Sequence, residues 1–289
     1  ESLRRNAPKS KCYLAVFVCL EVKAVHLELS HDLSTESFLR VLDRFVSRRG
    51  ICRSIYSDNA TNFQGASREL EEVYSMITAS FTEISNHLAK QHIEWKFAPP
   101  TAAHFNGLAE AAIKSAKHHI GRVLGNQVMT FEELTTLLAR VEAVLNSRPL
   151  GSISSDPLEA ADYLSPGHFL VGMPLLAVPE ADVLDVPLNR LNRHQLIQHA
   201  AQSFWKRWRT EYLPSLIPRE KWTDSKENLL PGDVVFIRKL QTPYLHWPIG
   251  KILEVYPGKD NVTRVAKVKT SSGEYVRPVH TMVPLPPLY

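Results

Sequence analysis

The chain has 289 residues, of which 44% are hydrophobic, so it is long enough for more than one packed domain. Its formal net charge of +4 is uneven, because the segment from Trp205 onward holds 14 basic and 8 acidic residues, a net of +6 that leaves −2 for residues 1–204. No run of about 18 apolar residues occurs, so we expect no membrane span. Three cysteines without a C-x-x-C pair indicate neither a disulfide framework nor a zinc site and fit a nuclear or cytoplasmic protein.

The first elements predict a mixed α/β layout. Residues 13–20 form an apolar run typical of a buried strand, and residues 24–29 alternate as a second strand paired with it in a hairpin. Ser34 or Thr35 caps a helix that Gly50 ends. A short strand over residues 54–57 follows.

The next segment predicts helices over about residues 65–76 and 80–92, a strand over residues 93–98, and a helix from about residue 108. Strand–helix alternation after an antiparallel hairpin indicates a mixed sheet flanked by helices. Such sheets place their chemistry at the carboxyl ends of strands.

Asp58 stands at such an end, in the stretch "IYSDNATNF". Asp and Asn are also common turn residues, because their side chains bond to nearby backbone. A turn is therefore one interpretation of Asp58, and a site for a charged ligand is the other.

Glu110 is the second carboxylate that fits such a site, in "HFNGLAEAAIKSAKHH". On a helix it shares one side with Lys114 and Lys117. A solvated amphipathic helix would explain this pattern. Two carboxylates close together could instead hold Mg²⁺ or Mn²⁺, with the lysines contacting nucleic-acid phosphates.

The chain resembles the integrases of BEL/Pao-class retrotransposons over nearly its whole length. The resemblance rests on motifs in the same order, namely "FVCLEVKAVHLEL", "LDRFVSRRG", "SDNATNF", "HFNGLAEAAIKSAKHH", "LNSRPL", "SPGHFLVG", "LLPGDVVFI" and "WPIGKILEVYPGKDNVTRVAKVKT". It implies a ribonuclease-H-like core in which three carboxylates, D, D and E, bind two divalent metal ions. Asp58 matches the second Asp, Glu110 matches the Glu, Asn59 follows the metal-binding Asp, and the lysines of the Glu110 helix match DNA-contacting positions.

The first Asp of that family lies on a strand that would precede residues 13–20, and this chain has no matching carboxylate there. We therefore expect a core that lacks its first strand, in a fragment of a longer integrase or in a captured, inactive derivative. Two-metal catalysis uses a carboxylate that bridges both ions. We expect no DNA strand joining by this chain alone.

Residues 130–147 predict a helix that ends at Arg148-Pro149, and residues 150–191 predict an extended linker. His168, within "SPGHFLVG", fits a hydrogen-bonded structural histidine better than a ligand. Residues 192–212 predict a helix containing "FWKRWRTEYL". Its Trp205 and Trp208 could stack on bases or pack within their own domain.

Four or five short strands between residues 228 and 287 predict a small all-β barrel. In the family this part resembles the C-terminal DNA-binding barrel. Its candidate phosphate contacts are Arg238, Lys239, Lys251, Arg264, Lys267 and Lys269. Each should contribute about one unit to the salt dependence of binding, unless these cations are ordinary surface charges.

These observations predict a partial catalytic core at residues 1–149, a linker and helical region at 150–227, and the barrel at 228–289. They favour an integrase fragment that binds element ends and target DNA as a homo-oligomer. A catalytically inactive DNA-binding or multimerising module and a ribonuclease-H-type nuclease are the alternatives.

Overall fold

The computed structural model describes residues 9–57, 68–97, 117–125, 127–153, 163–175, 179–215, 228–237, 244–258 and 260–285. The chain divides into two compact units. Unit 1 comprises residues 1–21, 25–111 and 129–138, and unit 2 comprises residues 22–24, 112–128 and 139–289. The predicted boundaries at 149 and 227 do not coincide with this division.

The hairpin at the start of unit 1 is confirmed. Strands β1 (Tyr13–Val18) and β2 (Val25–Ser30) pair antiparallel, with Val16 opposite Leu27. β2 is the more buried strand, because its residues from Val25 to Leu29 are all shielded from solvent.

Helix α1 (Thr35–Arg49) begins and ends where the capping residues predict. The Ser34 hydroxyl accepts a hydrogen bond from the backbone N–H of Ser37 (3.2 Å). Gly50 adopts a φ of 85° and donates its N–H to Val46 O (2.8 Å). A glycine tolerates this positive φ without a Cβ clash.

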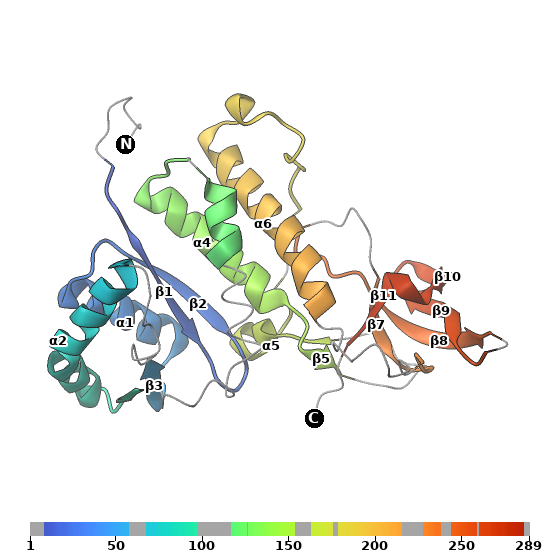
Figure 1. Ribbon diagram of the computed structural model, residues 1–289, viewed down its shortest axis with the longest axis horizontal. Coiled ribbons are helices and arrows are strands. Elements are labelled where there is room, and N and C mark those ends of the chain that lie inside the picture. The colour runs from blue at the N-terminus through green and yellow to red at the C-terminus, as the bar shows by residue number, and fades with distance from the viewer. Residues whose placement is uncertain are drawn as a thin grey trace. The chain divides into compact units, whose positions relative to one another are not determined.

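Helix α2 (Arg68–Lys90) is continuous, so the predicted break between two helices is wrong. No glycine or proline lies within these residues, and a helix propagates through polar positions once it is nucleated. α1 and α2 contact each other in unit 1 (Figure 1).

Strands β3 (Ser54–Ser57) and β4 (Glu94–Phe97) pair parallel, with Ser57 opposite Phe97. They share one hydrophobic core with α1 and α2, centred on Leu42, Ile84 and Trp95. Phe17 of β1 and Ile55 of β3 both pack against this core. The two strand pairs therefore belong to one packed unit. Among the described residues, each pairs only within itself.

Unit 2 contains a helix over residues 117–124. Helix α4 (Phe131–Ser147), whose second half lies in this unit, begins one residue after the predicted start at Thr130, which caps it. There the Glu133 carboxylate accepts from the Thr130 N–H (2.7 Å), and the Thr130 hydroxyl accepts from the Glu133 N–H (3.2 Å). The predicted helix over residues 192–212 is also confirmed, as helix α6 (Arg193–Ser215).

The segment between α4 and α6 is more structured than the predicted extended linker. It contains the paired strands β5 (Gly151–Ser152) and β6 (Tyr163–Leu164), helix α5 (Pro166–Val171) and the 3₁₀ turn η3 (Leu188–Arg190). Such short elements carry too few residues for a periodic hydrophobic pattern, so the sequence alone did not reveal them.

Five antiparallel strands form what we call the C-terminal sheet. They are β7 (Val234–Ile237), β8 (Ile249–Pro257), β9 (Thr263–Thr270), β10 (Gly273–Pro278) and β11 (Met282–Pro284). Their order is β10-β9-β8-β7-β11, and the 3₁₀ turn η4 (Val279–Thr281) leads into the last strand. The prediction of four or five short strands is confirmed. Closure into a barrel stays a prediction, because β10 and β11 are the two edges of the sheet.

The structure thus confirms a mixed α/β chain followed by an all-β segment, whereas the ribonuclease-H-like assignment stays a prediction. Within the described ranges, no helix combines the length and the apolar character needed to cross a bilayer.

Candidate nucleic-acid interface and metal site

The predicted metal site lies outside the described residues. Asp58, Asn59, Glu110 and Lys114 all fall there, as do Arg238 and Lys239. The separation of the Asp58 and Glu110 carboxylates therefore stays a prediction. The described residues contain no cluster of three or more His, Cys, Asp or Glu side chains that could hold a metal ion.

Ser57, the last residue of β3 and the residue before Asp58, lies within the described ranges and is held in place by side-chain contacts. Trp95 of β4 donates its indole N–H to the Ser57 hydroxyl at 2.9 Å. The Trp95 ring lies 5.7 Å from the ring of Phe38 on α1 and 5.9 Å from that of Phe81 on α2. The residue before Asp58 is therefore fixed by both helices and by the neighbouring strand.

One side of the 117–124 helix is buried, and exposed cations lie on another side. His119 is 1% exposed, and its ring centroid lies 6.3 Å from that of Phe204 on α6. Lys117 is exposed, as a phosphate contact requires, and Arg122 is a second exposed cation on the same helix. Sequence reasoning missed Arg122, although its distance of four residues from the exposed His118 was a usable signal.

Lys251 does not face solvent, which corrects its prediction as an exposed phosphate contact. Its side chain is 0% exposed, on the strand β8 that lies between β7 and β9. β8 pairs with both β7 and β9, and Lys251 lies in its buried stretch from Gly250 to Ile252. The apolar run around it was the missed signal.

The other described cations of the C-terminal sheet lie at its surface. Both Arg264 and Lys267 form ion pairs: the Arg264 guanidinium contacts both Asp260 carboxylate oxygens (2.9 and 2.6 Å), and Lys267 Nζ lies 2.7 Å from Glu274. Hydrogen bonds from Arg264 and from the Val262 backbone lower the pKa of Asp260 to about 2. Lys269 is exposed and forms no ion pair with another described residue. It is the predicted contact most available to a phosphate.

Trp205 and Trp208 of α6 pack inside their own unit. Trp205 is 3% and Trp208 1% exposed, and both rings contact Trp247, at centroid distances of 4.8 and 6.0 Å. Bases could not reach these rings in this arrangement. The self-packing interpretation is therefore confirmed. Lys206 and Arg207, between the two tryptophans, are exposed.

The "SPGHFLVG" segment is a short capped helix, and His168 has the structural role predicted for it. His168 Nδ1 accepts the backbone N–H of Ser165 (3.0 Å) and lies 2.9 Å from its hydroxyl. A Cβ at Gly167 would lie 3.2 Å from Asn146 O of α4. Gly172 ends the helix with a φ of 78°.

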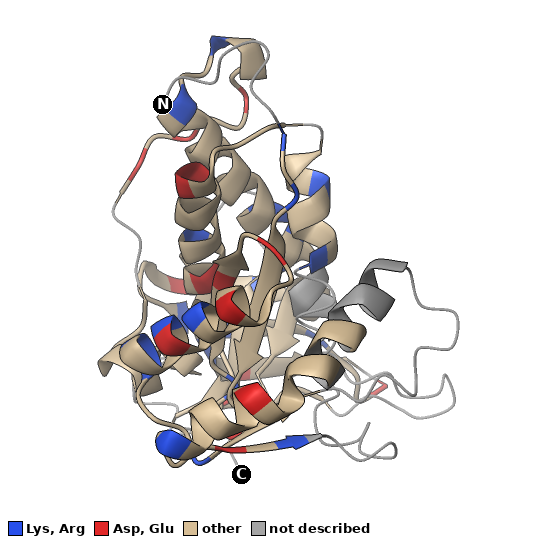
Figure 2. Ribbon diagram, turned by 90° about the vertical axis from the view of Figure 1, so that its left-hand side faces the viewer, with Lys and Arg blue, Asp and Glu red and all other residues tan. Residues whose placement is uncertain are grey.

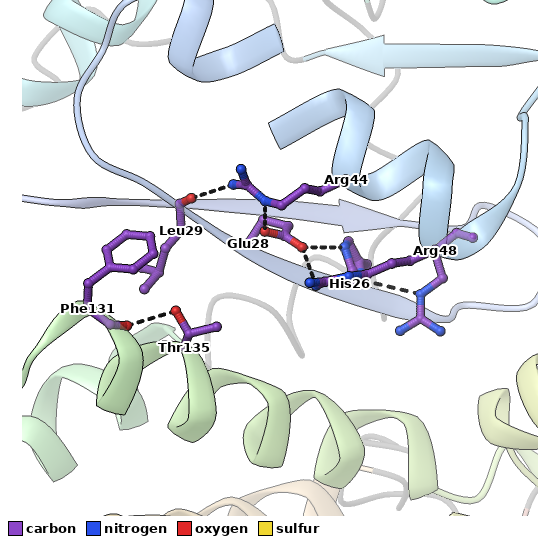
Figure 3. A network of polar contacts seen from close by, with 8 residues as sticks. His26, Glu28, Leu29, Arg44, Arg48, Phe131 and Thr135 are labelled. Atoms are coloured by element: carbon purple, nitrogen blue, oxygen red, sulfur yellow. Dashed lines mark hydrogen bonds and ion pairs between the residues drawn. The ribbon is translucent and has the colours of Figure 1, made fainter. Parts of the chain in front are cut away.

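A buried carboxylate in β2 is surrounded by basic side chains that sequence reasoning missed. Glu28 is 5% exposed, yet it pairs with Arg44 and Arg48 of α1 and with His26 (Figure 3). The four-residue spacing of the arginines was a signal for a shared helix side.

Basic and acidic residues are intermixed along the described helices (Figure 2). Overall charge therefore does not locate an interface, and local geometry must do so.

Residues 192–285 match the model of a family of unknown function, DUF5641. This range begins just before α6 and ends after β11. No curated protein matches the chain.

Among solved structures, the chain is similar to one in a cryo-electron-microscopy structure titled as the simian T-cell lymphotropic virus intasome in complex with the PP2A regulatory subunit B56 gamma. The identity is 11%, the TM-score is 0.34, and the match covers 94% of this chain and 72% of that chain. This TM-score does not establish a shared fold, so the catalytic and DNA-binding predictions do not rest on the match.

Proposed function

We propose that this chain is part of a retroelement integrase, with Asp58 and Glu110 as two of its metal-binding carboxylates and with DNA as its partner. The proposal rests on the ordered motifs of the sequence. The structural observation that supports it best is the parallel pair β3–β4, which directs the chain into Asp58 from a strand end anchored by Trp95. In such sheets, ligands bind at the carboxyl ends of the strands.

Within the described residues of unit 1, no strand joins the β1–β2 pair to the β3–β4 pair. β1 and β3 each have one partner strand among the described residues, and side chains of both pack on the same core. A strand that paired with β1 on one side and β3 on the other would join the two pairs into a single mixed sheet. In the integrase family the first metal-binding Asp is carried on such a strand.

DNA binding is the second part of the proposal. Lys117 and Lys269 are exposed, and Arg264 and Lys267 lie at the surface of the C-terminal sheet. Cations of this kind contact phosphates and carry little sequence information. They would position DNA, whereas a Mg²⁺ ion held by Asp58 and Glu110 would polarise the phosphodiester that reacts.

Manganese binding tests the carboxylate assignment. We expect the purified chain to hold one Mn²⁺ weakly, because two carboxylates without the bridging Asp leave most ligands to water. Asp58→Asn and Glu110→Gln preserve side-chain size and should each abolish that site in a titration followed by the EPR signal of free Mn²⁺. Asp260→Asn removes a carboxylate that belongs to an ion pair of the C-terminal sheet and should leave binding unchanged.

The outcomes separate the competing functions. Mn²⁺ binding that neither Asp58→Asn nor Glu110→Gln alters would contradict the metal assignment and favour the inactive DNA-binding module. Cleavage of an RNA–DNA hybrid without DNA strand joining would favour the nuclease. Strand joining by this chain would contradict our expectation that it is inactive alone.

A further inference from the structure

Three arginines lie along α1, the last of them in its final turn. Arg40, Arg44 and Arg48 are spaced by four residues, so they share one side of the helix at steps of about 6 Å along its axis. We call these three residues the arginine stripe.

The stripe is anchored from beneath by Glu28. Arg44 Nε lies 2.7 Å from Glu28 Oε2, and Arg48 Nη1 lies 2.6 Å from Glu28 Oε1. Arg44 also donates from Nη2 to the backbone oxygen of Leu29 at 2.8 Å (Figure 3). These bonds fix two guanidinium groups against β2.

The carboxylate is hidden from solvent, whereas the cations are not. The Glu28 side chain is 6% exposed, compared with 39% for Arg44 and 57% for Arg48. An anion that approaches from solvent therefore meets the guanidinium groups before the carboxylate that anchors them. The three cations of the stripe pair with two carboxylates, Glu28 and the exposed Glu36, which leaves a local excess of positive charge.

The anchored arginines retain hydrogen-bonding capacity. A guanidinium carries five N–H donors, and the bonds to Glu28 and Leu29 use two from Arg44 and one from Arg48. Groups that are already held in place lose little conformational entropy when they bind a further anion.

We propose that the arginine stripe binds the phosphodiester backbone of a nucleic acid. A nucleic-acid strand carries one phosphate per nucleotide, so a straight row of cations can contact several phosphates in succession. The choice of nucleic acid over another polyanion rests on the proposed function. The surface itself belongs to α1 in unit 1, whereas the C-terminal sheet belongs to unit 2.

A purely structural role would explain part of this arrangement, because Arg44 and Arg48 compensate a buried carboxylate and basic residues favour a helix C-terminus. That role does not involve Arg40. The Arg40 side chain is 65% exposed, and its partner Glu36 is 78% exposed, so their ion pair contributes little to stability. Arg40 therefore distinguishes the two explanations without risk to the fold.

The experiment measures binding of a fluorescein-labelled DNA duplex by anisotropy between about 50 and 200 mM salt. Arg40→Gln should weaken binding and reduce the slope of log K against log salt by about one unit. Glu36→Gln removes the competing carboxylate and should strengthen binding. Lys96→Gln is the matched control, since it breaks an exposed lysine–glutamate pair that belongs to β4 rather than to α1.

Three outcomes would overturn the inference. An unchanged slope in Arg40→Gln, combined with a reduced slope in Lys269→Gln, would refute the stripe and leave the proposed function intact. Equal losses in Arg40→Gln and Lys96→Gln would show a response to net charge rather than to a surface. Absence of DNA binding by the unaltered chain would contradict both the stripe and the proposed function.

Discussion

Tyr244, in the segment before β8, contacts α4 through both its hydroxyl group and its aromatic ring. Its hydroxyl donates to the backbone oxygen of Arg140 at 2.9 Å, and the Arg140 guanidinium lies 5.0 Å from its ring centroid. Burial raises the pKa of Tyr244 to about 12, although the nearby Arg140 opposes this shift. The structure therefore favours the neutral phenol.

The raised pKa predicts a pH dependence of stability. Between about pH 10 and 12 the folded chain keeps a phenol proton that the unfolded chain has released, so the free energy of unfolding falls as pH rises. Below about pH 10 the contribution is complete. Tyr244→Phe should remove up to roughly 2–3 kcal/mol of this alkaline loss, as measured by urea unfolding at a series of pH values. Tyr275→Phe, at an exposed tyrosine of β10, is the control for the loss of a tyrosine hydroxyl.

The polar residues of "LNSRPL" are buried, which hydropathy did not suggest. Ser147 is 0% and Arg148 4% exposed. Arg148 donates to Leu145 O (2.6 Å) and to Lys23 O (2.7 Å). A buried guanidinium satisfied by carbonyl oxygens ties the end of α4 to the turn between β1 and β2. The motif is thus explained by packing within unit 2.

At the scale of elements, Trp247 packs the C-terminal sheet against α6 and bonds to the end of α4. Its ring packs on Phe236 of β7 at 5.3 Å and on the two tryptophans of α6. Its indole N–H donates to the Ser147 hydroxyl at 3.1 Å. One side chain thereby joins three elements.

Two tryptophan substitutions should separate the hydrogen bond from the ring packing. Trp247→Phe loses the bond to a buried hydroxyl as well as ring volume, whereas the Trp205 N–H has no hydrogen-bond partner among the described residues. We expect Trp247→Phe to cost about 1–2 kcal/mol more than Trp205→Phe. Chemical denaturation measures both, and equal costs would show that the Trp247 bond contributes nothing.

The capping residues explain why helix starts were predictable. Ser34, Thr130 and Asn192 each accept a backbone N–H through a side-chain oxygen at the start of a helix. These bonds are local in sequence, so their residue types alone indicate the boundary. The interior of α2 offered no such signal, and residues 77–79, of which only Thr78 is polar, were mistaken for a break.

At the scale of the molecule, unit 2 combines α6 and the C-terminal sheet in one packed body. The family of unknown function matches this same combination, because its model extends from residue 192 to residue 285. The predicted boundary at residue 227 separates elements that share the Trp205, Trp208 and Trp247 contacts. We expect α6 and the sheet to unfold together.

Gly250→Ala tests this expectation. A Cβ at Gly250 would lie 2.5 Å from a Val268 methyl carbon and 3.0 Å from Lys269 O, so β8 and β9 must separate to admit it. Hydrogen–deuterium exchange should then show reduced protection in α6 as well as in the sheet. Val41→Ala, a cavity in unit 1, should leave α6 unchanged. Loss of protection confined to the sheet would contradict cooperative unfolding.

The sequence determined the elements whose signals are local. The hairpin, α1, α4, α6 and the C-terminal strands all follow from hydrophobic period, caps and turns. The exposure of Lys117 and Lys269 followed from the same patterns. The Asp58–Glu110 site stays a prediction, because neither residue lies in the described ranges.

Only the tertiary structure decided which charged and aromatic residues are accessible. Lys251 and Trp208 become buried through contacts with strands and side chains far away in the sequence. Glu28 is also buried, and it pairs with the more exposed Arg44 and Arg48. The physical reason is that burial depends on which element covers a side chain, and that partner is chosen by packing between segments that no local pattern connects.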